Sequence, residues 1–175
     1  AIVRGVPELA SDYIRTFVCP HHRVREKMMV CPEGGNAREA VTFYRTGEDF
    51  GNYALMELHP QTGRTHQLRI HMLHILTPIV ADRMYIGQST FTRTEILKSA
   101  ANSKRRPQIV ADANTSGLPP ESASTDNDVL IARQALHAFR LTIRHPVSGK
   151  DMQFEAPFPE DFQRTLEFLR SLRPV

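Results

Sequence analysis

The chain has few cysteines, no long apolar run and no recognisable signal peptide. Only two cysteines, Cys19 and Cys31, occur in its 175 residues, and they do not form a C-x-x-C motif. Free thiols in a reducing compartment are the simplest interpretation of such a pair. No apolar run reaches the roughly 18 residues of a membrane-spanning helix, and no segment has the pattern of a secretory signal. We therefore expect a cytoplasmic protein without a membrane partner.

The length and composition are those of one globular domain. Its 175 residues are enough to build a hydrophobic core. Hydrophobic residues make up 41% and charged residues 23%, which are ordinary values for such a domain. The formal net charge of +3 is compatible with an RNA partner but does not by itself identify one. Because no internal repeat or second domain is visible, we expect a single domain over residues 1–175.

Alternating apolar and polar residues predict a β-hairpin in the first half of the chain. Residues 39–46 place Val41 and Phe43 on one face, which is the pattern of a half-buried strand. Residues 53–59 form a second strand-like run, and residues 47–52 between the two have the composition of a turn. The two strands are therefore expected to pair.

The other segments give weaker or shorter signals. Residues 6–37 indicate an irregular excursion with a weak strand near 27–31. Residues 135–145 alternate in polarity and predict a strand that pairs with residues 152–156. Residues 161–172 carry apolar side chains at helical spacing and predict an amphipathic helix.

Residues 88–128 differ from their surroundings in composition. They contain a short potential helix at 94–101 and a basic cluster at 104–106. Residues 116–128 are rich in Ser, Pro, Asn and Asp and have few apolar side chains. We expect this whole segment to be an exposed insertion within the domain.

The most distinctive segment is 62–72, Thr-Gly-Arg-Thr-His-Gln-Leu-Arg-Ile-His-Met. It leads from the second strand into a helix predicted over 66–76, with Thr65 as a plausible N-cap. The N-terminus of a helix is electropositive, and Arg64 and Arg69 add positive charge there. Such a place suits a phosphate, or a catalytic carboxylate that must stay ionised. From the residues alone, a solvated charged surface remains an equally good interpretation.

Four apolar residues of the predicted helix are spaced to share one face, which we expect to be buried: Leu68, Met72, Ile75 and Leu76. Three polar residues lie on another face: Gln67, His71 and His74. The two histidines are neighbours on the helix and could suggest a metal. Because no cysteine or carboxylate nearby completes a ligand set, we expect no metal site.

The nine residues Gly-Arg-Thr-His-Gln-Leu-Arg-Ile-His at 63–71 match G-R-T-H-Q-[LI]-R-[IV]-H. This string is the third signature motif of the RluA-type RNA pseudouridine synthases, which the chain resembles. Other segments resemble further family motifs: 1–5 the end of K-x-Y-x-A-x-V-x-G, 40–44 A-x-T-x-Y, 78–85 P-I-x-G-D-x-x-Y, 133–138 R-x-x-L-H-A, and 141–162 the closing L-x-x-x-H-P-x-x-G-x-x-x-x-F-x-A-P-x-P-x-x-F.

The resemblance implies an α+β fold with a mixed, largely antiparallel sheet, flanking helices and an RNA cleft beside the 62–72 turn. The chain would be the C-terminal portion of the catalytic domain. The implied activity is the isomerisation of uridine to pseudouridine in structured RNA, either rRNA or tRNA, without a cofactor. A carboxylate acts as nucleophile in such chemistry, and the uridine must first leave its stack. The oligomeric state stays open.

Site residues follow from the same resemblance. Arg69 would pair with the nucleophilic aspartate and keep it ionised. The substrate-binding residues would be Arg64, His66, Gln67, Arg133 and Leu136, with Leu136 forming an apolar floor near the flipped base. For Arg64, a contact to phosphate and a structural role in the turn are equally open. For His66 and Gln67, hydrogen bonds to nearby backbone are the simpler interpretation.

The family's H-R-L-D-x-x-T-S-G motif, which carries the nucleophile, does not occur in the chain. The tyrosine of K-x-Y-x-A would fall just before Ala1. We therefore expect a fragment of a longer polypeptide that is inactive alone; activity would require another carboxylate, such as Asp82. Two alternatives are an RNA-binding remnant without catalysis and a basic interaction domain without an RNA partner.

Such a fragment should be poorly stable for two reasons. Arg69 would be a buried charge without its partner, and the strand at residues 1–5 would leave an open sheet edge. In addition, Leu76 and Ala81 stand where the family usually has glycine. Because glycine after a helix commonly takes a left-handed conformation that other residues adopt only with strain, we expect the loop 76–82 to be remodelled.

Overall fold

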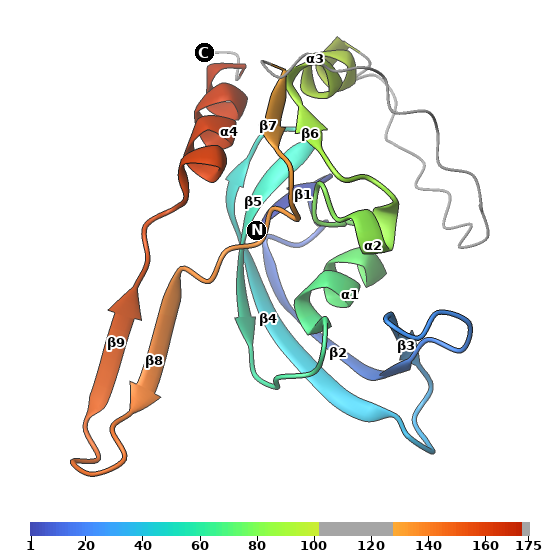
Figure 1. The fold of residues 1–175 in the computed structure, drawn as a ribbon, viewed down its shortest axis with the longest axis vertical. Helices are drawn as coiled ribbons and strands as arrows, with labels where there is room; N and C mark the ends of the chain where they lie inside the picture. The colour runs from blue at the N-terminus through green and yellow to red at the C-terminus, as the bar shows by residue number, and fades with distance from the viewer. Residues whose placement is uncertain (102–127, 173–175) are drawn as a thin grey trace.

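The computed structural model describes residues 1–101 and 128–172 (Figure 1). Nine strands and four helices lie within these ranges, in the order β1 Ile2–Arg4, β2 Ser11–Pro20, β3 Met28–Cys31, β4 Arg38–Asp49, β5 Tyr53–Pro60, α1 Gln67–His74, α2 Arg83–Ile86, β6 Phe91–Thr92, α3 Arg93–Ala101, β7 Val129–Ile131, β8 Arg140–Arg144, β9 Asp151–Glu155 and α4 Glu160–Ser171. None of the helices in these ranges combines the length and apolarity needed to cross a bilayer.

A curled five-stranded sheet forms the body of the molecule, with strand order β1-β5-β4-β2-β3. All four of its strand pairs are antiparallel. Helix α1 lies inside the curve of this sheet (Figure 1). Two small antiparallel pairs, β6–β7 and β8–β9, complete the strands of the described residues. The α+β class predicted from the sequence is confirmed, with every described pair antiparallel.

The hairpin predicted in the first half of the chain is confirmed. β4 and β5 pair from Thr42↔Pro60 to Asp49↔Ala54, and the register shifts between Thr46 and Glu48. This irregularity lets β4 continue to Asp49, so the turn is shorter than predicted. The backbone N–H of Phe50 closes it by donating to the Tyr53 carbonyl at 2.9 Å.

The weak strand predicted near residues 27–31 is confirmed as β3, but the prediction that the rest of residues 6–37 is irregular is wrong. This segment contains β2, a 10-residue strand that pairs with β4 on one side and with β3 on the other. Ile14 and Val18 point into the core and are 5% and 1% exposed. The other face of the strand stays accessible, so Tyr13 is 50% exposed although it is aromatic. Apolar residues therefore occur on both faces, and the expected alternation of polarity is lost.

The main core lies between the sheet, the 79–81 loop and the elements that follow it. Phe91 of β6 and Ile96 of α3 are 0% and 2% exposed and belong to this core. The exposed insertion predicted over 88–128 is therefore wrong for its first part, which packs against the sheet. The helix predicted at 94–101 is confirmed as α3. The basic cluster at 104–106 and residues 116–127 lie outside the described residues.

The edge of the sheet at β1 is covered. Ile2 N–H donates to the Ala135 carbonyl and Arg4 N–H to the Pro78 carbonyl, each at 2.9 Å. The Val80 N–H donates back to the Ile2 carbonyl at 3.1 Å. These bonds satisfy the side of β1 that faces away from β5, so the open edge expected at residues 1–5 is wrong.

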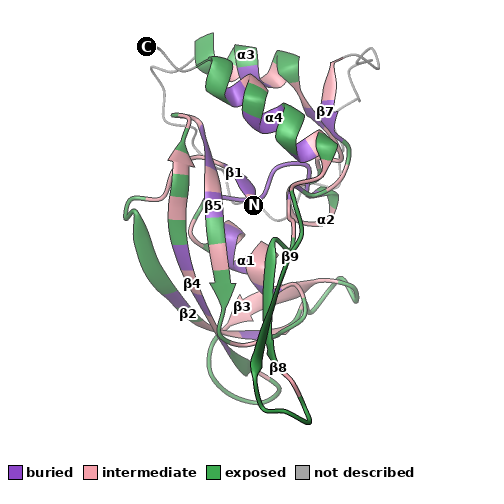
Figure 2. Cartoon of the chain, turned by 90° about the vertical axis from the view of Figure 1, so that its left-hand side faces the viewer, coloured by how far each residue is buried: buried purple, intermediate pink, exposed green. Residues whose placement is uncertain are grey.

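The second predicted hairpin is confirmed as β8–β9, although β8 begins at Arg140 rather than at residue 135. The hairpin extends away from the sheet (Figure 1), and both strands are exposed along their whole length (Figure 2). Residues 132–139 instead form an irregular connection in which Ala135 is buried. The predicted C-terminal helix is confirmed as α4, with Phe162, Leu166 and Leu169 in the core.

Leu76 and Ala81 both take the left-handed conformation, with φ of 61° and 56°. The Thr77 N–H donates to the Met72 carbonyl at 2.9 Å and the Leu76 N–H to the Leu73 carbonyl at 3.1 Å. This bonding pattern is that of a Schellman helix end, in which glycine usually occupies the position of Leu76. The remodelled loop that we expected is therefore absent here: the turn is kept and two non-glycine residues adopt the strained backbone.

Replacing Leu76 with glycine should stabilise the protein. Its side chain is 57% exposed, so little packing is lost, whereas the left-handed backbone of a non-glycine residue costs roughly 1–2 kcal/mol. After the greater flexibility of glycine in the unfolded chain is counted, we expect Leu76→Gly to raise the free energy of unfolding by about 1 kcal/mol in urea titrations. The matched control is Leu9→Gly, at an exposed leucine without positive φ, which should be neutral or destabilising. Equal effects at both positions would contradict this account.

Candidate active site

Gln67 fixes the turn from β5 into α1. Its side-chain oxygen accepts from the Thr62 hydroxyl at 2.7 Å and the Arg64 N–H at 3.0 Å. Its side-chain nitrogen donates to the Val41 carbonyl and to the Thr42 hydroxyl oxygen, each at 3.0 Å. All four hydrogen-bonding positions of the amide are thus used, and Gln67 ties the turn to β4.

The helix begins one residue later than predicted and is not capped by Thr65. The N-cap position belongs to His66, which has φ of 55° and no side-chain cap. The predicted N-cap is therefore wrong, because the Gln67 side chain takes up the Arg64 N–H that precedes the helix. The helix ends at His74, two residues before the predicted end.

The buried face of α1 is partly polar. His71 is fully buried, with Nδ1 2.8 Å from Oγ1 of Thr42 and Nε2 3.0 Å from Oγ1 of Thr16. Gln67, Ile70 and Met72 are the other buried residues of the helix. The purely apolar buried face that we predicted is wrong, since the sheet offers threonine hydroxyls to the polar side chains. Both ring nitrogens of His71 face threonines, so His71 and His74 do not converge on a metal position.

Arg69 forms a two-pronged ion pair with Asp82. Nε donates to Oδ2 at 2.8 Å and Nη2 to Oδ1 at 2.6 Å. The Asp82 side chain is 2% exposed and that of Arg69 is 12% exposed, and these hydrogen bonds raise the pKa of the Arg69 guanidinium. The expectation that Arg69 is left as an uncompensated charge is therefore wrong. Burial of both charges makes the pair much less sensitive to screening than a surface pair.

Tyr85 of α2 packs on the same guanidinium. Its ring centroid lies 4.8 Å from Cζ of Arg69, which is a cation–π distance. Its hydroxyl oxygen accepts from the Met28 N–H at 3.1 Å and lies 2.9 Å from Nδ1 of His66. Burial, followed by the charge of Arg69, lowers the pKa of His66, so the Tyr85 hydroxyl can donate to a neutral ring. Tyr85 thereby links α1, α2 and β3.

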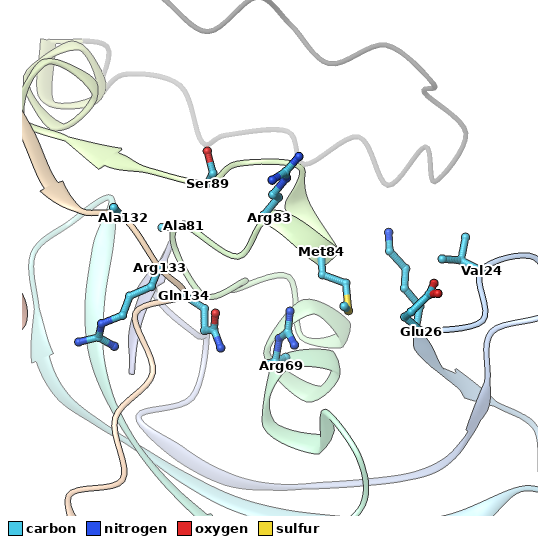
Figure 3. Close-up of a pocket in the computed structure, with 11 residues that line it drawn as sticks. Val24, Glu26, Arg69, Ala81, Arg83, Met84, Ser89, Ala132, Arg133 and Gln134 are labelled. Atoms are coloured by element: carbon cyan, nitrogen blue, oxygen red, sulfur yellow. The ribbon is translucent and has the colours of Figure 1, made fainter. Parts of the chain in front are cut away.

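An open cleft of about 770 Å³ lies beside Arg69 (Figure 3). Its walls come from the β2–β3 loop, α1, α2 and the connection that precedes β8, as Figure 3 shows. Four cationic side chains line it: Lys27, Arg69, Arg83 and Arg133. Glu26 is the one acidic residue among the lining residues that the structure describes, and Ser89 and Gln134 are further polar ones. This balance of charge favours an anionic ligand.

The predicted site residues divide into two groups. Arg69 and Arg133 line the cleft, and Arg133 also donates to Oδ1 of Asp161 at 2.8 Å. Arg64, His66, Gln67 and Leu136 are not among the lining residues. Arg64 Nε instead donates to the Glu39 carbonyl at 2.9 Å, and Leu136 packs partly buried against the core. Their roles in binding RNA stay predictions.

Lys27 and Arg83 were not predicted to lie in the cleft, because Lys27 belongs to no motif and Arg83 stands at a variable position of the string at 78–85. Asp82 and Tyr85 did carry a signal. Both stand in the string at 78–85 that resembles P-I-x-G-D-x-x-Y, yet only the spatial pairing with Arg69 shows their place in the site.

Comparison with the sequences of known proteins points to one family. The family model described as RNA pseudouridylate synthase matches residues 2–74. An uncharacterized RNA pseudouridine synthase of Chlorobaculum parvum is 35% identical over 173 residues, which cover 98% of this chain and 46% of the relative. The chain belongs to the RNA pseudouridine synthase family. Ribosomal large subunit pseudouridine synthase D of Haemophilus influenzae is 37% identical over 154 residues, or 86% of this chain and 38% of that protein.

The structure has the fold of this family as well. The solved structure of human RNA pseudouridylate synthase domain containing 4 matches 97% of this chain and 60% of its own, with a TM-score of 0.63 and 24% identity. The 175-residue chain itself spans less than half the length of the two curated relatives named above.

The buried His71 should make stability depend on pH. Burial, followed by the charge of His74, lowers its pKa from 6.5 to about 4. Because the unfolded chain binds this proton more readily, the contribution of His71 is complete above about pH 6.5 and is lost progressively as the pH falls towards 4. The total is about 3 kcal/mol.

This dependence can be isolated by substitution. Between pH 7 and 4, the free energy of unfolding in urea should fall by about 3 kcal/mol more for the wild type than for His71→Gln. The exposed His59 provides the control, since His59→Gln should keep the dependence of the wild type. Parallel pH curves for the wild type and His71→Gln would show that His71 is not responsible.

Proposed function

We propose that this chain is the C-terminal portion of the catalytic domain of an enzyme that isomerises uridine to pseudouridine in structured RNA, either rRNA or tRNA. One observation carries the proposal: Arg69, from the segment that matches the family's third motif, lies in the wall of a cleft lined by three further cationic side chains. The named relatives, which include a ribosomal large subunit pseudouridine synthase, support the same activity.

In the proposed reaction the bond between the ribose and N1 of uracil breaks, and the ribose is joined to C5 instead. One proton leaves C5 and one returns to N1, so the net change needs no co-reactant and no cofactor. The nucleophile is a carboxylate, and an arginine beside it keeps it ionised. Arg69 supplies that arginine. Its position in the cleft wall is where a uridine extruded from its stack would enter.

The remaining cations of the cleft suit the RNA backbone. Lys27, Arg83 and Arg133 lie in three different segments, so together they can contact phosphates on either side of an extruded nucleotide. Such contacts position the RNA without reading its sequence, because phosphates are the same in every nucleotide. The negative charge of the RNA backbone is therefore what these cationic side chains would recognise.

In the proposed reaction we assign the nucleophile to a position outside these 175 residues, since the H-R-L-D motif does not occur among them. Asp82, the carboxylate that pairs with Arg69, is buried and committed to that ion pair and to the cap of α2. It is therefore poorly placed to attack a sugar. A cytoplasmic location is part of the same proposal, because rRNA and tRNA are modified where ribosomes and tRNA are found.

Activity should require Arg69 and a polypeptide longer than this chain. We expect the full-length protein to form pseudouridine in mixed cellular RNA, and residues 1–175 alone to form none. In the full-length protein, Arg69→Ala should lower turnover by at least about 100-fold while RNA affinity stays nearly unchanged. Arg69→Lys should also be largely inactive, since lysine cannot make two parallel contacts to a carboxylate.

The control for these variants is Arg45→Ala, which removes a surface arginine paired with Glu57 and should leave turnover intact. Normal turnover by Arg69→Ala would remove Arg69 from the site. Turnover by residues 1–175 alone would show that the nucleophile lies within them. RNA binding by a full-length protein that forms no pseudouridine would support the non-catalytic alternative.

RNA affinity should depend on salt through the cleft cations. If Lys27 and Arg83 each neutralise one phosphate, each alanine substitution should weaken binding at low salt and reduce the slope of log K against log salt concentration by about 1. Fluorescence anisotropy with a structured RNA, recorded between about 50 and 300 mM salt, measures the slope. Arg170→Ala serves as control, because this arginine of α4 pairs with Glu48 of β4 and does not line the cleft. Unchanged slopes for both cleft variants would exclude phosphate contacts.

A further inference from the structure

The ion pair with Asp82 uses only part of the Arg69 guanidinium. A guanidinium carries five N–H donors, arranged so that two edges can each hold an anion. Asp82 takes the edge made by Nε and one hydrogen of Nη2. Among residues 1–101 and 128–172, no acceptor meets the end-on edge, made by Nη1 and the second hydrogen of Nη2, and Arg69 lines the cleft.

Asp82 is itself held firmly. It occupies the N-cap position of α2, where Oδ1 accepts from the Tyr85 N–H at 3.3 Å and the backbone carbonyl from the Ile86 N–H at 2.9 Å. The preceding residues Val80 and Ala81 are buried in the core. The Ala135 N–H also donates to the Val80 carbonyl at 3.0 Å. The carboxylate therefore offers Arg69 a fixed partner.

Tyr85 restrains the same guanidinium from a second direction. Asp82 fixes it along one edge, and the Tyr85 ring packs over it at 4.8 Å. The ring is in turn held through its hydroxyl by Met28 and His66. The paired contact to Asp82 and the ring contact of Tyr85 together restrain the guanidinium and leave its end-on edge in one orientation. Neither Asp82 nor Tyr85 is among the residues that line the cleft.

We propose that Asp82 and Tyr85 are positioning residues, which hold Arg69 so that its end-on edge meets an anion in the cleft. Under the proposed function, on which this inference rests, that anion is the nucleophilic carboxylate. Asp82 also compensates the buried charge of Arg69, so the arginine is held by the fold before the second anion arrives. A single arginine between two carboxylates thereby acts through the direction of its donors as well as through its charge.

The test is steady-state kinetics of the full-length protein with Asp82→Asn. Asparagine is a good N-cap, so α2 should persist while the paired contact to Arg69 is lost. Because small misplacements of a catalytic group are costly, we expect kcat to fall by about 100-fold. KM for RNA should stay within about twofold, since Asp82 does not line the cleft and its substitution misplaces Arg69 without removing a contact to the RNA.

Three further substitutions extend the test. Asp82→Glu keeps the charge but moves it by one methylene, so kcat should lie between the wild type and Asp82→Asn; it decides the matter if Asp82→Asn does not fold. Tyr85→Phe keeps the ring over Arg69 and should retain more kcat than Tyr85→Leu, which removes it. The matched control is Glu57→Gln, which breaks an arginine–carboxylate pair on the exposed sheet surface and should change neither constant.

The outcomes separate the two levels of inference. A lower kcat at unchanged KM for Asp82→Asn, with the expected order of the tyrosine variants, supports the positioning role. An active wild type with equally active Asp82→Asn, or variants that raise KM alone, overturns the positioning role and leaves the proposed function standing. A wild type that forms no pseudouridine overturns the proposed function and this inference with it.

Discussion

The polar seam between α1 and the sheet is the interaction on which the site depends. The hydroxyl of Thr42 on β4 forms hydrogen bonds with both Gln67 and His71, which lie one helical turn apart on α1. The hydroxyl of Thr16 on β2 contacts the other ring nitrogen of His71. A buried polar group is costly unless it is hydrogen-bonded, so these partners fix how α1 is rotated about its axis and where it lies along the strands. In that orientation, Arg69 lies in the wall of the cleft.

A buried arginine has to be compensated before it can serve a ligand. Asp82 provides this compensation through a two-pronged contact. The same carboxylate also caps α2, so the start of this helix helps to hold Asp82 in place. The loop that carries Asp82 accepts backbone strain at Ala81, whose φ is 56°. Strain of this kind persists where the surroundings fix it. Here the buried 79–81 segment and its bonds to β1 supply the constraint.

The β2–β3 loop and α2 face each other across the cleft and are joined through Tyr85. Lys27 precedes the Met28 N–H that the Tyr85 hydroxyl accepts, so the position of one cleft cation depends on the residue that also packs on Arg69. A shared tyrosine of this kind links the wall that holds Arg69 to the wall that carries Lys27. The cleft is thus one connected unit assembled from distant segments of the chain.

The sequence by itself determined the family, the α+β class, the two hairpins and helices α3 and α4, and it marked Arg69 as a candidate site residue. Those features rest on local periodicity or on a contiguous motif. Only the tertiary structure decided that residues 11–20 form a strand between β4 and β3, that Gln67 and His71 are buried, and that Arg69 pairs with Asp82. Each of these depends on a partner far along the chain: β4 for the strand, threonine hydroxyls for the helix, and a carboxylate thirteen residues away for the arginine. Local sequence carries no record of such partners, because whether a polar side chain can be buried is set by what the fold brings to meet it.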